Sequence, residues 1–477
     1  MSRKIFVLGT GPLLESGARV MSGQCLRTWH FCKPLLDAGH AVELMTVPIP
    51  GTTTDDASSV CEVAHYGSFT YRRFNVNDKA RVLPQVLAAL RAGRPDAMVG
   101  VNAYPAYLLA CAGMEPRPEG NAIPLWADLN GWTMAEGLIR GKVVGHDRDF
   151  THFWRMEMLT ALRADFFSTV TTRQAHALLG EMTTLGRATA DASRIVTTVA
   201  NAVYPDYAGI TRRVAVPEFL HDRLSADALI VLWTGGFNSW TDVPMLVSGI
   251  RDAMKAEQRL AFVCTGGAVH GHDEKTYADF LALAEKELPR DRFLPLGWID
   301  FDQVLALHAS AHVGLNLDGD NIETVFGARN RVTNMLGAGI PVISTCGTEI
   351  AEWVERNALG AIIPQAQPAA LTAALRESVA SAEAWSERAA RARIRALEEF
   401  GAANTLRTFL GWCENPRTAA VIEEADVANL RAIMEWLASR PESLNAPVAP
   451  NAAHAPDSAN MSKVEKLARL LKGIVRD

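Results

Sequence analysis

Residues 313–345 read VGLNLDGDNIETVFGARNRVTNMLGAGIPVIST. This stretch begins with a short apolar strand at 313–317 and ends with a second at 341–345, and the residues between them are enough for a helix. Two parallel strands need a crossover of a dozen or more residues, usually a helix. The stretch therefore predicts a βαβ unit in a parallel sheet.

The same alternation of apolar strands and helical lengths continues through most of the chain. The expected strands are 4–8, 41–47, 97–101, 123–126, 166–170 and 195–199 in the first half, and 228–233, 260–264, 293–296, 313–317, 341–345 and 361–363 in the second. Asn201-Ala-Val-Tyr-Pro205 separates the two series. We therefore predict an α/β protein with two Rossmann-like domains, residues 1–205 and 206–400, whose parallel sheets face each other across a cleft.

The C-terminal part of the sequence has a different character. Residues 401–440 predict a helical segment that returns toward the N-terminal domain, and 441–461, rich in Pro, Ala, Asn and Ser, predict a flexible linker. Residues 462–477 form an amphipathic helical pattern in which basic residues outnumber acidic ones. Such a helix docks on an anionic membrane or on a partner, including a second copy, or it packs on its own protein.

Composition excludes several classes of protein. The chain has 477 residues, of which 48% are hydrophobic and 21% charged, so it can build packed cores. Its formal charge of −6 argues against a nucleic-acid-coating protein. Seven cysteines without a Cys-x-x-Cys pair support neither a disulfide framework nor a zinc site. No apolar run reaches the ~20 residues that span a bilayer. We expect a soluble, cytoplasmic protein, with peripheral contact at the inner face of the membrane as an added expectation from the basic tail.

Candidate site residues follow the strands, because parallel sheets bind ligands outside the carboxyl ends of their strands. After the first strand, Gly9-Thr-Gly-Pro12 predicts a flexible loop that includes Gly11, or an incomplete dinucleotide motif. After 123–126 come Asp128, Asn130 and Trp132. A carboxylate, an amide and the flexible Gly131 at one strand tip can contact sugar hydroxyl groups, or Asp128 only closes an Asx turn.

The second half has a more polar set at the same positions. Gly235-Gly236 follows the strand 228–233, and paired glycines let the backbone approach an anionic group, or form a tight turn without a ligand. After 313–317 come residues that would cradle a nucleotide, or form a salt-bridged start of a helix. They are Glu323, Gly327, Arg329, Arg331 and Asn334. Asp318 and Asp320 would support a metal-dependent alternative.

Several of these segments resemble a known family. They are Gly235-Gly236, Gly297-Trp-Ile-Asp300, Ala338-Gly-Ile-Pro-Val342, Ala164-Asp165 with Thr172-x-Gln174, and Gly39-His40-Ala-Val. The chain is similar in these segments to glycosyltransferases of the GT-B fold, most of all to the retaining family-4 group. It departs from that group at Asn334, which stands where the family has the second glutamate of its E-x(7)-E pattern. The family's lysine after the Gly-Gly turn is also missing.

The resemblance implies transfer of a sugar from a nucleotide-diphosphate donor to a glycan or lipid-linked acceptor, with retention and without a metal or cofactor, in surface polysaccharide or glycoconjugate synthesis. Asp128 and Glu323 are the catalytic candidates that it implies. Gly235, Gly236, Gly327, Arg329, Arg331 and Asn334 would hold the nucleotide sugar, and Gly11, Asn130 and Trp132 would lie on the acceptor side. A nucleotide-sugar epimerase and a catalytically inactive GT-B module in a polysaccharide assembly complex remain alternatives.

Overall fold

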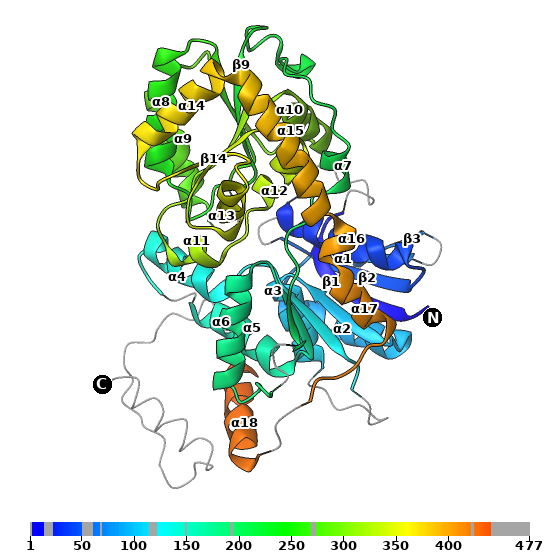
Figure 1. The fold of residues 1–477 in the computed structure, drawn as a ribbon. Helices are drawn as coiled ribbons and strands as arrows, with labels where there is room; N and C mark the ends of the chain where they lie inside the picture. The colour runs from blue at the N-terminus through cyan, green and yellow to red at the C-terminus, as the bar shows by residue number, and fades with distance from the viewer. Residues whose placement is uncertain are drawn as a thin grey trace, which may run out of the picture.

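The structure, a computed structural model, describes residues 2–13, 22–49, 61–66, 69–113, 122–147, 150–190, 194–268, 273–420 and 424–439. Its two sheets lie in two domains, the second above the first in Figure 1, and helices cover both. The expected α/β architecture with two parallel sheets and a helical C-terminal region is confirmed.

The N-terminal sheet has the strand order β3-β4-β2-β1-β5-β6-β7-β8. Its strands are β1 (Lys4–Gly11), β2 (Ala41–Pro48), β3 (Cys61–Tyr66), β4 (Phe69–Phe74), β5 (Ala97–Val101), β6 (Leu125–Leu129), β7 (Phe166–Thr169) and β8 (Val196–Thr198). Helices α1 (Gly23–Asp37), α2 (Lys79–Gly93), α3 (Ala103–Ala112), α4 (Thr133–Val144), α5 (Phe150–Arg163) and α6 (Thr172–Thr184) complete this domain. All its strand pairs are parallel except β3 with β4.

The second sheet, β11-β10-β9-β12-β13-β14, is parallel throughout. Its strands are β9 (Leu229–Thr234), β10 (Leu260–Thr265), β11 (Phe293–Gly297), β12 (Val313–Asn316), β13 (Val342–Thr345) and β14 (Ala361–Ile363). The helices of this domain are α8 (Val243–Ala256), α9 (Lys275–Glu287), α10 (Phe301–Ser310), α11 (Ile322–Phe326), α12 (Asn330–Gly337), α13 (Glu349–Arg356) and α14 (Pro368–Ala380). Residues 313–345 form the βαβ unit that the sequence predicts, with two short helices in its crossover.

The last described helices run from the second domain back to the first (Figure 1). They are α15 (Ala382–Glu399), α16 (Ala402–Thr405), α17 (Arg407–Glu414) and α18 (Ala425–Ser439). Phe409 of α17 packs edge-on against Phe31 and Trp126, with ring centroids 4.8 and 5.1 Å apart. Glu435 of α18 pairs with Arg163 at 2.8 Å. The expected linker 441–461 and basic helix 462–477 lie outside the described residues.

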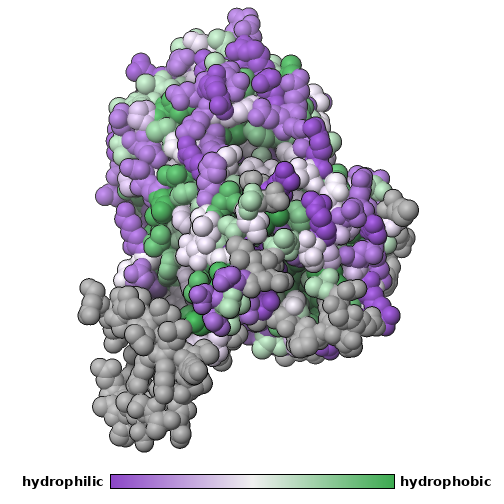
Figure 2. Space-filling model, turned by 60° about the horizontal axis from the view of Figure 1, so that its bottom comes forward, coloured by the Kyte–Doolittle hydropathy of each residue, from purple (hydrophilic) through white to green (hydrophobic). Residues whose placement is uncertain are grey.

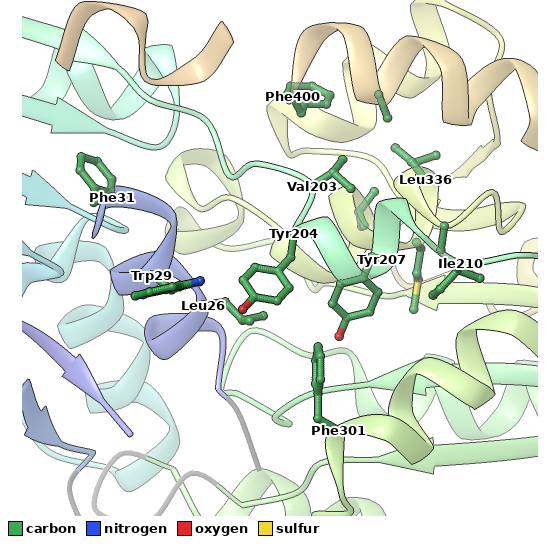
Figure 3. Packing of buried hydrophobic residues seen from close by; sticks show 14 of the residues in the cluster. Leu26, Trp29, Phe31, Val203, Tyr204, Tyr207, Ile210, Phe301, Leu336 and Phe400 are labelled. Atoms are coloured by element: carbon green, nitrogen blue, oxygen red, sulfur yellow. The ribbon is translucent and has the colours of Figure 1, made fainter. Parts of the chain in front are cut away.

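One apolar core passes through the junction of the two domains. The segment that links the two domains, residues 199–208, is named the linking segment. In Figure 3, its Tyr204 lies between Leu26 and Trp29 of α1 and the aromatic rings of Tyr207 and Phe301. Tyr207 belongs to the short linking helix α7 (Pro205–Ala208), and its ring centroid is 5.7 Å from that of Phe301. The linking segment is therefore part of the core rather than a free tether.

Two strands were not expected from the sequence. β3 and β4 form an antiparallel pair at the sheet edge, and β4 alternates buried Phe69 and Tyr71 with the less buried Thr70 and Arg72. A strand at an edge needs only one apolar face, so it lacks the continuous apolar run that predicts a strand buried on both sides.

Among the described helices, none combines the length and the apolar character that a membrane span requires.

The fit of the linking segment against α12 gives a first prediction. A Cβ atom on Gly337 would lie 2.2 Å from Cγ1 of Val203, so Gly337→Ala should lower the free energy of unfolding by about 1–3 kcal/mol through overpacking. Gly411 in α17 has no atom within 4 Å of the same position, and Gly411→Ala should stabilise by up to about 1 kcal/mol through helix propensity. Urea unfolding of both variants tests this; equal effects would contradict the packing argument.

Candidate active site between the two domains

The carboxyl ends of the two sheets face each other. Trp132, which follows β6, packs edge-on against Phe326, which follows β12, with ring centroids 4.6 Å apart. Thr171, which follows β7, donates its hydroxyl hydrogen to the Phe326 carbonyl at 2.8 Å. In Figure 1, α4 and α6 of the first domain accordingly lie beside α11 of the second. This is the edge at which parallel sheets bind ligands.

Arg331 lies at the turn after β9. Its Nη2 donates to the Gly236 carbonyl at 2.7 Å, and its guanidinium carbon lies 4.1 Å from the centre of the Trp233 ring. Its Nη1 is buried and has no hydrogen-bond partner among the described residues. Burial lowers the pKa of Arg331 to about 10, so the side chain stays charged at neutral pH. A partly buried cation with a buried, unsatisfied donor beside a Gly-Gly turn is suited to an anionic group.

Two further buried donors belong to the same turn. Trp233 Nε1 and Ser239 Oγ have no hydrogen-bond partner among the described residues. Gly235 has a φ of +91°, which only glycine adopts without strain, and Arg331 Nη2 is 3.9 Å from the position of a Cβ at Gly235. The predicted pair Gly235-Gly236 and Arg331 are therefore brought together.

Arg329 is placed differently. Its Nε donates to Asp318 at 2.8 Å, while Nη1 and Nη2 bind both carboxylate oxygens of Glu323 at 3.0 and 2.6 Å. All three side chains are buried. Arg329 is thus neutralised by two carboxylates, and both oxygens of Glu323 are bound by Arg329. The expected roles of Arg329 in nucleotide-sugar binding and of Glu323 in catalysis stay predictions. The salt-bridged alternative describes this pair.

Gly327 has a packing role in that ion pair. A Cβ at Gly327 would lie 2.1 Å from Oε1 of Glu323 and 2.3 Å from Nη1 of Arg329. Asp318 also accepts a hydrogen bond from Asn316 Nδ2 at 2.8 Å. Among the described residues no group of three or more His, Cys, Asp or Glu side chains could hold a metal ion.

Asp128 is also engaged. Its two oxygens accept from Arg27 Nε and Nη2 at 3.0 and 2.7 Å, and Ser168 Oγ donates to Oδ1 at 2.7 Å. Asp128 is 0% and Arg27 2% exposed. Arg27 in turn donates to the carbonyls of Val199 and Ala200 at 2.7 and 3.1 Å. Asp128 therefore holds the start of the linking segment through Arg27, and its expected catalytic role stays a prediction.

Asn334 holds the other end of the same segment. Its Oδ1 accepts from the backbone N–H of Tyr204 at 3.0 Å, and its Nδ2 donates to Asn330 Oδ1 at 3.1 Å. Asn334 is 4% exposed. The expected role of Asn334 in holding the nucleotide sugar stays a prediction.

The three acceptor-side residues have separate environments. Gly11 lies in β1 rather than in a loop, and a Cβ there would be 2.4 Å from Thr46 Oγ1. Trp132 donates its Nε1 hydrogen to Glu181 at 2.9 Å and lies against Phe326 of the other domain. Asn130 is half-buried and donates to Asn102 Oδ1 at 2.9 Å. Of these three residues, only Asn130 has a side-chain acceptor, Oδ1, without a hydrogen-bond partner in the described part of the chain.

Asn102 was missed in the sequence. Its φ of +76° and ψ of +154° lie in a region that glycine normally occupies. Its Nδ2 donates to Thr10 Oγ1 at 3.2 Å and to the Gln24 carbonyl at 3.1 Å, and its Oδ1 orients Asn130. The only signal was its place after an expected strand, and the strained backbone has no pattern in the sequence.

Three glutamates lie at or near the start of α4: Glu136 in its first turn, the buried Glu157 of α5, and the partly buried Glu181 of α6. Burial, and then the negative charge of Glu323, raise the pKa of Glu136 to about 8 against the opposing effect of Arg329. Burial raises the pKa of Glu181 to about 7, although the hydrogen bond from Trp132 opposes this. Burial and the charge of Glu181 raise the pKa of Glu157 well above its usual range. At neutral pH the raised pKa values favour the protonated form of Glu136 and Glu157.

A pH dependence follows. The unfolded chain releases the Glu136 proton near pH 4.5, whereas the folded protein keeps it up to about pH 8. Stability should therefore fall as pH rises through that window, because the native state binds the extra proton. Relative to Glu136→Gln, the wild type should lose up to about 1 kcal/mol per pH unit between pH 6.5 and 8. Denaturant unfolding at several pH values tests this; parallel curves for both proteins would contradict it.

The ion pair of Asp128 with Arg27, which holds the linking segment, gives a separate prediction. Asp128→Asn leaves Arg27 buried without a counter-charge and should cost about 3–5 kcal/mol of stability. Asp78→Asn is the matched control, because Asp78 caps α2 through Arg81 N–H at 3.1 Å and asparagine caps as well. Guanidinium unfolding measures both; a fully stable but inactive Asp128→Asn variant would support the catalytic interpretation.

Comparison with solved structures gives the fold a name. The chain is similar to sucrose-phosphate synthase from Thermosynechococcus elongatus (16% identity, 86% of this chain and 98% of that chain, TM-score 0.61). It is also similar to the alpha,alpha-trehalose-phosphate synthase (UDP-forming) from Burkholderia vietnamiensis (14%, 87% and 97%, TM-score 0.63) and to Anabaena HepE in complex with UDP-glucose (12%, 86% and 99%, TM-score 0.59). No family model matches the sequence, and no curated protein matches it. These neighbours are GT-B glycosyltransferases, so the expected GT-B fold is confirmed.

Proposed function

We propose that this protein is a glycosyltransferase that moves a sugar from a nucleotide-diphosphate donor to a glycan or lipid-linked acceptor. The single observation that carries the proposal is Arg331, a partly buried cation whose buried Nη1 has no hydrogen-bond partner among the described residues, beside the Gly235-Gly236 turn at the carboxyl edge of the second sheet. A neighbour of the same fold binds UDP-glucose, which makes UDP the first nucleotide to test.

The chemistry of the proposed reaction is the departure of a diphosphate from the anomeric carbon. Arg331 would stabilise the charge that develops on the diphosphate from a partly buried position, where such an interaction is stronger than in open water. Glu323 and Asp128 act as positioning residues in this proposal, because their oxygens are bound by Arg329 and Arg27. Asn130 would accept a hydrogen bond from an acceptor hydroxyl and so orient it.

Other parts of the proposal rest on the sequence. Retention at the anomeric carbon, independence of metals and cofactors, and a place in surface polysaccharide or glycoconjugate synthesis follow from the family resemblance. A cytoplasmic location with contact to the membrane or to a second copy through the basic C-terminal helix follows from residues 462–477.

A second candidate is a nucleotide-sugar-binding module without turnover. The observation that favours it is the full engagement of both carboxylates expected to be catalytic, Asp128 and Glu323. UDP-sugar binding without release of UDP in the presence of any acceptor would select this candidate.

Donor binding can be tested by thermal shift. UDP should raise the melting temperature of the wild type by several degrees at saturation, with and without Mg²⁺, because a ligand of the folded state stabilises it. Arg331→Ala should lose at least tenfold in UDP affinity, since an ion pair to a phosphate is removed.

The control for that experiment is Arg356→Ala, at the exposed C-terminal end of α13. It removes the same charge and should leave the shift unchanged. An equal shift in Arg331→Ala and the wild type would overturn the assignment of Arg331. A shift that needs Mg²⁺ would direct attention back to Asp318 and Asp320.

A further inference from the structure

The two domains touch on two sides, and the side away from the linking segment is built around Arg173. Arg173 is the second residue of α6, on the N-terminal domain. Its Nη1 donates to two carbonyls of the other domain, Val325 at 3.1 Å and Gly347 at 2.6 Å. Its Nη2 binds the carboxylate of Glu352. One side chain thus ties together α11, the turn after β13 and α13.

The contact is reciprocal. The backbone N–H groups of Thr172 and Arg173 donate to the two oxygens of Glu349 at 3.0 and 2.6 Å. The first N–H groups of a helix have no partner within the helix, and its N-terminal end favours negative charge. The Glu349 carboxylate of the C-terminal domain therefore caps α6 of the N-terminal domain, and the Arg173 side chain of α6 in turn binds the C-terminal domain.

The two sides of the interface differ in strength. On the side of the linking segment, a continuous apolar core joins the domains (Figure 3). On the α6 side, the charged contacts are partly open to water: the side chains of Arg173 and Glu352 are 29% and 55% exposed. Solvent-exposed ion pairs contribute little each and are easily broken. The α6 side can therefore separate while the linking segment keeps its packing.

Closure on the α6 side completes the candidate site. α11 carries Glu323, which binds Arg329 two residues from Arg331. On the other domain, Trp132 and Glu136 are four residues apart at the start of α4 and share one helix face. Trp132 contacts Phe326, and the negative charge of Glu323 raises the pKa of Glu136. These contacts lie on the same side of the interface as Arg173.

We propose that Arg173 is a positioning residue that holds the two domains closed for the transfer reaction, with Glu349 as its reciprocal partner. Closure of this kind excludes water and aligns the two substrates. The catalytic consequence rests on the proposed function, whereas the closed arrangement itself can be measured without a substrate.

The experiment measures the distance between the domains. Spin labels are placed at Lys142→Cys in α4 and Glu355→Cys in α13, both exposed, in a background with Cys61→Ser and Cys346→Ser. Pulsed dipolar spectroscopy should give one short distance for this protein. Arg173→Ala should add a longer-distance population, and Arg173→Lys, which keeps the charge but not the planar fork, should give an intermediate one. Arg356→Ala, which removes an arginine of α13, should leave the distribution unchanged.

Function is read in parallel. With UDP-glucose as donor, Arg173→Ala should lower kcat at least tenfold, while the thermal shift by UDP stays as in the wild type because Arg331 lies within one domain. An unchanged distance distribution in Arg173→Ala would overturn the inference. Failure of UDP to bind the wild type would overturn the proposed function and leave the distance result to decide the role of Arg173.

Discussion

The buried pair of Arg27 and Asp128 is the interaction on which the arrangement of the two domains depends. Asp128 neutralises Arg27 in a fully buried position, and Arg27 then donates to the backbone of the linking segment. An isolated buried charge would be very costly, so neither residue can occupy this position alone. The pair converts a strand tip of the first sheet into an anchor for the chain that leads to the second sheet.

The same segment is held from the other domain by a neutral group. Asn334 accepts the hydrogen bond of Tyr204 N–H, and the Val203 side chain lies against Gly337 in the same helix. The residues expected to bind substrate at Asp128 and Asn334 are therefore used to fix the domain junction. The anionic-ligand side then depends on Arg331, which no carboxylate binds in the described part of the chain. Arg329 and Arg331 differ in their partners: Arg329 binds two carboxylates, whereas Arg331 binds a backbone carbonyl.

Much of the fold was predictable because buried parallel strands carry continuous apolar runs separated by helical lengths. The antiparallel edge pair β3–β4 was missed, since only alternate residues of β4 are buried there. The site was less predictable. Sequence spacing placed Arg329 and Arg331 near the start of a helix, but it could not show that Asp318, five residues before Glu323, bends back to bind Arg329. Contacts between distant segments, such as Arg173 with Gly347, leave no local pattern at all.

In the proposed transfer reaction, neither Asp128 nor Glu323 offers a free carboxylate to the reacting centre. If the oxygens of Asp128 and Glu323 are committed to arginines, the barrier must be lowered by charge stabilisation at the diphosphate and by alignment of the acceptor. The two effects act together only in a given relative position of the domains, because Arg331 lies on one and Asn130 on the other. The rigid, apolar junction sets the axis of that arrangement. The polar contact at Arg173 determines how long the two domains stay closed. Turnover would therefore be limited by domain closure as much as by the chemical step.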